Sequence, residues 1–324
     1  MSRRNADEMP SIRRRNAGTR GSLTLTASAT VGLFFIQRYR FLTIDQYARI
    51  AGMNRNTASH QLCNFERHGL LGHFGNTGLA AGYGKTPKVY FLTRKGYALL
   101  SRESDIPPEL LGPHKAIKVE SRWSPQMYHR LRTVDLMISA EEAVGRRPQL
   151  AMVQTFLEYR LVKRGPQISR ETTDFVSVQE TAENRIIPDA ALIVENRETG
   201  RKGLFFIECD QATERITTHL RYHRKQTLHF KFEQYDRYLT GGRFANTYSA
   251  YGEFGFFTLL FVTLGLQRVE NIRAELHDLP DDLAHYYRLT TFEQAMGDFF
   301  GPIWKSRSHL DTRLYPLVSE RGRP

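Results

Sequence analysis

The sequence contains little cysteine and no long apolar run. Its only two cysteines, Cys63 and Cys209, lie far apart, and neither has neighbours at the spacing of a cysteine-based zinc site. No run of about 18 apolar residues is present, and residues 1–22 lack the apolar stretch of a secretory signal. These absences exclude a disulfide-bonded scaffold and argue against a membrane protein, so we expect a cytoplasmic protein with reduced thiols.

Several motifs of common enzyme classes are also absent. The sequence has no Walker phosphate loop, no dinucleotide-binding fingerprint and no serine at a nucleophile elbow. His219 and His223 have helical i, i+4 spacing, but no glutamate lies between them as in a HExxH zinc site. The indications of function therefore come from the distribution of charge and from the acidic side chains.

Positive charge is concentrated in the first third of the chain. The chain of 324 residues has 46 Lys and Arg against 34 Asp and Glu; up to Lys115 there are 17 basic and 7 acidic residues, and beyond it 29 and 27. An excess of this kind is typical of a protein that binds the phosphate backbone of nucleic acid. With 40% hydrophobic residues the chain is long enough for two globular domains.

The first domain is predicted to follow a basic tail. Residues 1–24 are rich in arginine and polar residues, and we expect them to be disordered. Residues 25–104 show three helical patterns, then a strand, a glycine-rich loop, a second strand and a fourth helix, with Thr43 and Thr93 as helix caps and Gly52 as a helix end. This order predicts a winged helix-turn-helix domain.

The third helix of this domain, Asn56 to His68, is the candidate for recognition of double-stranded DNA. Ala58, Leu62 and Phe65 form its apolar face, and the opposite face is polar. A helix of this kind enters the major groove with its N-terminal residues at the base edges, and the wing follows the phosphate backbone. The residues that we expect to contact DNA are Arg55, Asn56, Ser59 and His60 on the helix and Lys85 and Lys88 in the wing. The alternative is a winged helix that binds another protein.

A second domain is expected after a linker. Residues 105–124 are rich in proline and form the predicted linker, and residues 311–324 form a predicted C-terminal tail. Residues 125–310 alternate in type, which predicts an α/β domain with a mixed sheet flanked by helices. The expected elements are a helix at 125–145, a strand at 150–162, two strands within 185–196 and 201–213, a long helix at 212–239 and an apolar strand at 254–264.

Three carboxylates are predicted to meet in this second domain. Asp189 follows Pro188 at the start of one strand, while Glu208 and Asp210 lie at the end of the next and share a face, because side chains alternate along a strand. Such a cluster suits magnesium, which prefers oxygen ligands. Alternatively, the cluster is a structural remnant in which Thr213 and Glu214 cap the next helix.

The arrangement resembles the PD-(D/E)xK nuclease fold, and more specifically the replication-relaxation family of plasmids and mobile elements. The segments that carry the resemblance are MYHRLRTVDL, IPDAALIV, FFIECDQATE and KFEQYDRYL, together with FEQAMGDFFGPIW near the C-terminus. Membership implies a DNA-associated role in replication, relaxation or mobilisation. It also implies that Asp189 and Glu208 occupy the acidic positions of the nuclease motif.

The chain departs from this motif at its lysine, because Asp210 stands in that position. An aspartate there repels the substrate phosphate, whereas a lysine would stabilise it. Lys225 or Lys231, from the following helix, is the alternative source of positive charge. The sequence therefore favours a DNA-binding accessory protein without catalysis, which contacts a relaxase or replication initiator. A magnesium-dependent endonuclease, or a regulator whose second domain forms a homodimer, is the alternative.

Overall fold

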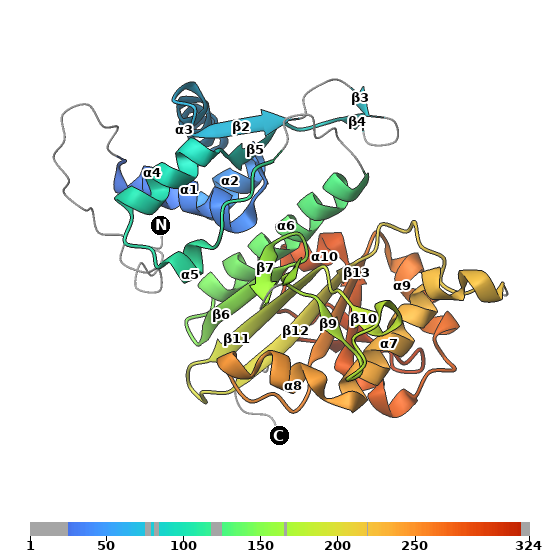
Figure 1. Cartoon of the computed structure of the whole chain (residues 1–324). Helices are drawn as coiled ribbons and strands as arrows, with labels where there is room; N and C mark the ends of the chain where they lie inside the picture. The colour runs from blue at the N-terminus through green and yellow to red at the C-terminus, as the bar shows by residue number, and fades with distance from the viewer. Residues whose placement is uncertain are drawn as a thin grey trace. The chain divides into compact units, whose positions relative to one another are not determined.

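The computed structural model divides the chain into two compact units (Figure 1). Unit 1 extends to Val134, and unit 2 starts at Asp135, so the division falls within helix α6 (Pro125–Gly145). None of the helices in the described part of the chain has an apolar stretch of the length that crossing a membrane requires. The described residues are 25–74, 79–80, 84–117, 125–164, 167–218 and 220–318.

Unit 1 is mainly helical and contains a small antiparallel sheet in the order β1-β5-β2. The glycine-rich loop contains a further short hairpin, β3 with β4, which was not predicted. The elements in chain order are α1 (Ala27–Tyr39), β1 (Leu42–Thr43), α2 (Ile44–Ala51), α3 (Arg55–Arg67), β2 (Leu71–Phe74), β3 (Leu79–Ala80), β4 (Gly84–Lys85), β5 (Val89–Leu92), α4 (Arg94–Glu103), α5 (Pro108–Leu111) and the first part of α6.

The helix ends of unit 1 follow the predicted signals. Thr43 caps α2 in a capping box with Gln46, and Gly52 ends this helix in the left-handed conformation with φ 64°. Asn54 caps α3 by accepting a hydrogen bond from the Thr57 amide at 2.9 Å, so α3 begins at Arg55, one residue before the predicted start. Local hydrogen bonding therefore sets the boundaries of both helices.

The core of unit 1 forms where these helices cross. Ala58, Leu62 and Phe65 are buried on α3, as their helical spacing predicted. Tyr47 of α2 packs against α1 at Gly32, where an added Cβ would lie 2.0 Å from the tyrosine oxygen. The absence of a side chain at Gly32 therefore leaves room for the Tyr47 hydroxyl.

Unit 2 is built on a mixed seven-stranded sheet in the order β16-β15-β14-β13-β12-β11-β6. The elements after α6 are β6 (Leu150–Leu157), β7 (Leu161–Arg164), β8 (Gln167–Arg170), β9 (Asp174–Phe175), η2 (Ala182–Asn184), β10 (Arg185–Ile186), β11 (Ala190–Asn196), β12 (Lys202–Cys209), η3 (Arg221–Gln226), α7 (Leu228–Gly241), α8 (Arg243–Thr247), η4 (Ser249–Tyr251), β13 (Thr258–Thr263), α9 (Leu266–Glu275), η5 (Asp281–Tyr286), β14 (Tyr287–Thr291), α10 (Phe292–Gly297), β15 (Trp304–Ser306) and β16 (Leu314–Tyr315).

The sheet combines parallel and antiparallel pairs, which confirms the predicted mixed sheet. Strands β12, β13 and β14 are parallel to one another, and all the other pairs in this sheet are antiparallel. The last strand, β16, belongs to the sheet although its residues fall in the predicted C-terminal tail. The predicted strand at 150–162 ends at Leu157, and a separate hairpin of β7 and β8 follows.

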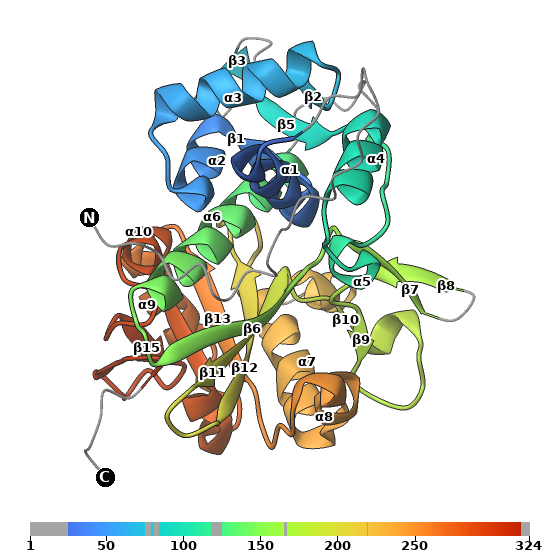
Figure 2. The same ribbon diagram turned by 90° about the vertical axis from the view of Figure 1, so that its left-hand side faces the viewer.

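Helix α7 lies beside the sheet (Figure 2), and aromatic side chains of this helix pack against it. The ring of Phe232 lies 5.3 Å from that of Phe261 on β13, and Tyr235 packs against Phe206 on β12. Phe206 also contacts Phe257 edge to face at 4.8 Å. Burying several aromatic rings at one contact contributes strongly to stability, so the position of α7 on the sheet is well defined.

The prediction of one helix over residues 212–239 is wrong. Helix α7 begins only at Leu228, where Thr227 caps it by accepting from the Phe230 amide at 3.2 Å. The Leu228 amide donates to the carbonyl of Arg215 at 3.0 Å. The chain near 215 therefore runs beside the start of α7, and Thr227, rather than Thr213 or Glu214, caps the helix. His219 lies outside the described residues.

Candidate functional site

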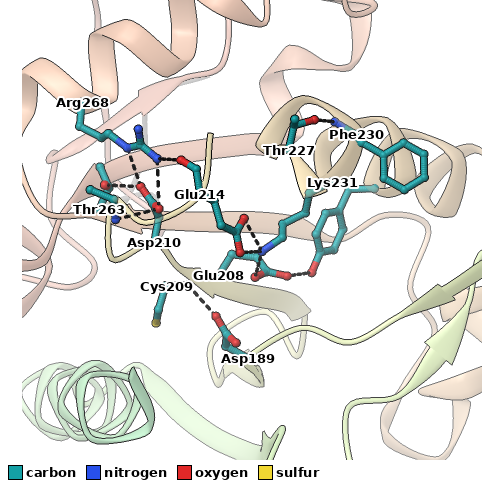
Figure 3. A network of polar contacts seen from close by, with 12 residues as sticks. Asp189, Glu208, Cys209, Asp210, Glu214, Thr227, Phe230, Lys231, Thr263 and Arg268 are labelled. Atoms are coloured by element: carbon teal, nitrogen blue, oxygen red, sulfur yellow. Dashed lines mark hydrogen bonds and ion pairs between the residues drawn. The ribbon is translucent and has the colours of Figure 1, made fainter. Parts of the chain in front are cut away.

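The pairing of two strands brings the first two predicted acids together (Figure 3). In the antiparallel register of β11 and β12, Ala190 lies opposite Ile207, and one further step along both strands places Asp189 beside Glu208. The Asp189 carboxylate accepts a hydrogen bond from the Cys209 amide at 2.8 Å. Two carboxylates that are nineteen residues apart in sequence thus meet at one end of the sheet.

The backbone around Asp189 is held from two sides. The carbonyl of Pro188 accepts a hydrogen bond from the Thr172 hydroxyl at 2.6 Å, and the carbonyl of Asp189 accepts one from the Glu158 amide at 2.9 Å. Both donors belong to residues that precede β11 in the chain. Asp189 itself is only partly buried. Its side chain therefore projects from a hydrogen-bonded backbone at a place that solvent can reach.

Glu208 lies deeper, and two side chains of α7 contact its carboxylate. The Tyr235 hydroxyl donates a hydrogen bond to one oxygen at 2.5 Å, and the Lys231 ammonium lies 3.3 Å from the other. Burial raises the pKa of Glu208 to about 7, although the nearby Lys231 charge acts in the opposite direction. Glu208 therefore has a fixed orientation and a carboxylate whose charge is costly without a neighbouring cation.

Lys231 reaches this site because α7 begins where it does. It lies in the first turns of α7, and its ammonium contacts Glu214 at 3.4 Å as well as Glu208. Its side chain is 33% exposed. Burial lowers the pKa of Lys231, but the charges of the surrounding carboxylates outweigh this effect and raise it above the ordinary value. Lys231 is therefore protonated at neutral pH.

Lys225, the other lysine considered for this role, contacts a different carboxylate. Its ammonium lies 2.6 Å from a carboxylate oxygen of Glu183, and both side chains are exposed. Since an exposed pair of this kind contributes little to stability, Lys225 serves as a matched surface control for Lys231. The structure thus distinguishes between two lysines that the sequence could not separate.

Asp210 points away from the other two acids and toward α9 (Figure 3). Its carboxylate accepts hydrogen bonds from the Thr263 hydroxyl at 2.7 Å and from the Arg268 guanidinium at 2.8 Å. Its side chain is 1% exposed. Within the described ranges, no three His, Cys, Asp or Glu side chains are grouped so as to hold a metal ion.

The two carboxylates that remain suit a hard cation. Magnesium retains several waters in proteins and is often bound by one or two carboxylates together with substrate phosphates. Asp189 and Glu208 supply carboxylates from adjacent strand ends, and their charges act on each other, since Asp189 also raises the pKa of Glu208. Asp189 and Glu208 are the residues that would hold such an ion.

The predicted DNA-contacting residues of α3 lie at the surface of unit 1. Arg55, Asn56 and His60 are exposed, and Ser59 is partly exposed. The Arg55 guanidinium pairs with the carboxylate of Asp45 on α2 at 2.6 Å, with side-chain exposures of 65% and 67%. An exposed pair of this kind is weak, so Arg55 can exchange Asp45 for another anion at little cost.

Lys88, one of the two lysines predicted to lie in the wing, is less exposed than the predicted contact residues of α3 that lie fully at the surface. The Lys88 ammonium lies 2.8 Å from the carboxylate of Glu66 at the end of α3, and the same carboxylate contacts His73 on β2. Lys88 is partly buried and lies over the ring of Tyr90, 4.9 Å from its centroid. Lys85 belongs to β4, but its side chain lies outside the described part of the structure.

Three contributors to the unit 2 site were not predicted as such: Tyr235, Glu214 and Arg268. Tyr235 follows Lys231 by one helical turn, and this i, i+4 spacing was the one available signal that the two share a face. Arg268 lies more than fifty residues from the motif, and no sequence pattern links it to Asp210. Such contacts depend on how α7 and α9 pack on the sheet.

Comparison with known proteins agrees with the resemblance seen in the sequence. The profile of the replication-relaxation family matches residues 33–253, which is well over half of the chain and includes Asp189, Glu208, Asp210 and Lys231. Searches of curated proteins and of solved structures gave no significant match. The chain belongs to the replication-relaxation family.

Proposed function

We propose that this protein is a metal-dependent DNA endonuclease of the PD-(D/E)xK class that acts in the replication, relaxation or mobilisation of a plasmid or mobile element. The observation that carries the proposal is the Lys231 ammonium 3.3 Å from the Glu208 carboxylate, at the strand end beside Asp189. Asp210 occupies the usual position of the motif lysine in sequence. In this proposal the Lys231 ammonium, from α7, supplies the positive charge of the missing motif lysine.

Asp189 and Glu208 are the proposed ligands of magnesium in this mechanism. When bound, magnesium would polarise the scissile phosphate and lower the pKa of a coordinated water. Tyr235 keeps one oxygen of Glu208 hydrogen-bonded, so the orientation of the carboxylate is set before substrate arrives. Preorganised ligands of this kind need no rearrangement when charge develops in the transition state.

Lys231 acts on the substrate phosphate. Because its pKa is raised, its ammonium stays protonated and donates hydrogen bonds to a non-bridging phosphate oxygen instead of accepting a proton. In the hydrolysis a water oxygen forms a new bond to phosphorus and one phosphate ester bond breaks. The water loses a proton to solvent, and the leaving sugar oxygen takes one up.

Unit 1 is proposed to be a winged helix that holds double-stranded DNA. The order of α1, α2 and α3 around the sheet of β1, β5 and β2 supports this interpretation. In the proposed complex the start of α3 lies in the major groove, where asparagine can pair with adenine and arginine with guanine. The proposed base contacts come from Arg55, Asn56, Ser59 and His60, and the phosphate contacts come from Lys85 and Lys88.

The second candidate is a DNA-binding accessory protein without catalysis. It is favoured by Asp210, which Arg268 engages on both oxygens, so that two carboxylates rather than three face the site. In this case unit 2 binds DNA without cutting it, or it contacts a relaxase, a replication initiator or a second copy of the chain. The two candidates differ in whether DNA strands are cut.

Incubation of the purified protein with supercoiled plasmid and magnesium or manganese tests the proposal. We expect the wild-type protein to convert the plasmid to nicked or linear DNA, and Asp189→Ala to leave it supercoiled. Gln267→Ala, an exposed change on α9 outside the site, is the control and should cut normally. Intact plasmid with both metals, at protein concentrations that retard the DNA in a gel, would instead favour the accessory protein.

A further inference from the structure

A partly buried ion pair links Asp210, which directly follows β12, to helix α9. Arg268 of α9 donates from its Nε to one oxygen of Asp210 at 2.8 Å and from its Nη2 to the other at 3.3 Å. The Thr263 hydroxyl at the end of β13 donates to the same carboxylate at 2.7 Å. The three contacts come from two elements, α9 and β13, so Asp210 is held between them.

Arg268 also holds the backbone at Glu214, in the segment that follows Asp210. Its Nη2 donates to the carbonyl of Glu214 at 2.6 Å, while the Ala212 amide donates to Asp210 at 3.0 Å. Ala212 has φ 57°, a left-handed conformation that a residue with a side chain rarely adopts without support. The Asp210 and Arg268 pair therefore stabilises a tight turn that would otherwise be unfavourable.

This turn determines where the Glu214 side chain lies. Its carboxylate contacts the Lys231 ammonium at 3.4 Å, next to the contact with Glu208 (Figure 3). Lys231 has a long flexible side chain that is one-third exposed, and holding it in one place requires contacts at its charged end. Glu208 supplies one such contact from the sheet, and Glu214 supplies the second from the turn.

We infer that Arg268 and Glu214 are positioning residues for Lys231, and that Asp210 serves as the anchor of Arg268. The chain of contacts runs from Asp210 through Arg268 to the backbone of Glu214, and from the Glu214 carboxylate to the Lys231 ammonium. The inference rests on the proposed function for its catalytic consequence, but the placement of Lys231 is a structural statement. It assigns a role to the aspartate that replaces the motif lysine.

The inference differs from a direct role of Arg268 on substrate. An arginine that contacts phosphate would act independently of Glu214, whereas an arginine that acts through the turn loses its effect once Glu214 no longer holds Lys231. A double-mutant cycle separates the two cases, because effects of residues in one pathway are not additive. The variants are Arg268→Gln, Glu214→Gln, the double variant of both, and Gln267→Ala as the control.

The first measurement does not depend on cleavage. In protein labelled with ¹⁵N-lysine, without metal or DNA, the ammonium resonance of Lys231 is assigned by its loss in Lys231→Arg. We expect Arg268→Gln to shift this resonance as Glu214→Gln does, and the double variant to add no further change. A Lys231 resonance at its wild-type position in Arg268→Gln would overturn the inference.

The second measurement is plasmid cleavage under saturating magnesium. Each single variant should lower kcat by about tenfold and change KM little, and the double variant should match the single ones rather than multiply them. Multiplying effects would overturn the inference and place Arg268 on the substrate. If Arg268→Gln fails to fold because Asp210 is left unpaired, the neutral pair Asp210→Asn with Arg268→Gln replaces it.

The two measurements distinguish this inference from the proposed function. If the wild-type protein cuts no DNA but the Lys231 resonance shifts as expected, the proposed nuclease function is contradicted and the positioning of Lys231 by Arg268 and Glu214 is supported. If the protein cuts DNA but the Lys231 resonance does not shift, the nuclease function is supported and the positioning of Lys231 by Arg268 and Glu214 is contradicted.

Discussion

The charged side chains at the start of α3 in unit 1 and those at the strand ends of unit 2 differ in their exposure to solvent. On α3, Arg55 and its partner Asp45 are each about two-thirds exposed, and water screens their attraction. At the end of the unit 2 sheet, Glu208 is buried, and its pKa is raised to about 7 because of this burial. A surface of the first kind can exchange partners readily, as a DNA-contacting surface must. A site of the second kind is preorganised and tolerates little change.

This difference predicts a large effect of single substitutions at the unit 2 site and a small effect of breaking the exposed ion pair of unit 1. It follows from the cost of leaving a buried charge without its partner, which far exceeds the loss of an exposed ion pair.

The largest effect is expected for Lys231. Lys231→Ala should lower kcat for plasmid cleavage by at least about 100-fold, because one preorganised donor to the phosphate is lost. Lys231→Arg, which retains the charge, should keep part of the activity. Lys225→Ala removes an exposed lysine of η3 and should cut at the wild-type rate. Equal losses in Lys225→Ala and Lys231→Ala would show that cleavage depends on the total positive charge of this surface rather than on the contact between Lys231 and Glu208.

An intermediate effect is expected at the start of α3. Asn56→Ala should weaken binding to a site selected from random duplexes by about 1–3 kcal/mol and should change binding to random DNA little. Titrations by fluorescence anisotropy at fixed salt measure both affinities. A similar loss on the two kinds of DNA would mean that Asn56 contacts the backbone and reads no base.

The pH dependence of stability probes burial at Glu208 directly. Its pKa of about 7 in the folded protein exceeds the ordinary value of 4.5, so the folded state binds this proton more tightly than the unfolded state does. As pH rises from 4.5 to 7 the unfolded state loses this proton while the folded state keeps it, so the free energy of unfolding falls by at most about 1.4 kcal/mol per pH unit.

Glu208→Gln removes this dependence. Urea unfolding in EDTA should show the variant gaining stability relative to the wild-type protein over that pH range. Glu253→Gln, at an exposed position, serves as the control and should run parallel to the wild-type protein. A constant difference between Glu208→Gln and wild type at all pH values would contradict the assignment.

The smallest effect is expected for the surface partner of Arg55. Asp45→Asn should change the free energy of unfolding by no more than about 0.5 kcal/mol, because the pair that it breaks is exposed. DNA affinity should rise a few-fold at low salt, since a negative charge is removed beside a proposed base contact, and the gain should vanish at high salt. A loss of affinity would show that Asp45 orients Arg55 for DNA.

Local sequence signals determined much of both units. The capping residues Thr43 and Thr93, the left-handed Gly52 and the apolar stripe of α3 all depend on neighbours within a few residues, and each was predicted correctly. The strand order that places Asp189 beside Glu208 also followed from alternation and a short turn, because an antiparallel hairpin brings such positions together.

Tertiary structure alone decided how the site is completed. The polar composition of residues 212–239 predicted one helix, yet the chain before Leu228 runs back beside the helix start and places Glu214 against Lys231. Arg268 meets Asp210 only because α9 follows β13, the parallel neighbour of β12. Contacts between residues so distant in sequence arise from the packing of helices on the sheet, and local propensity carries no information about them.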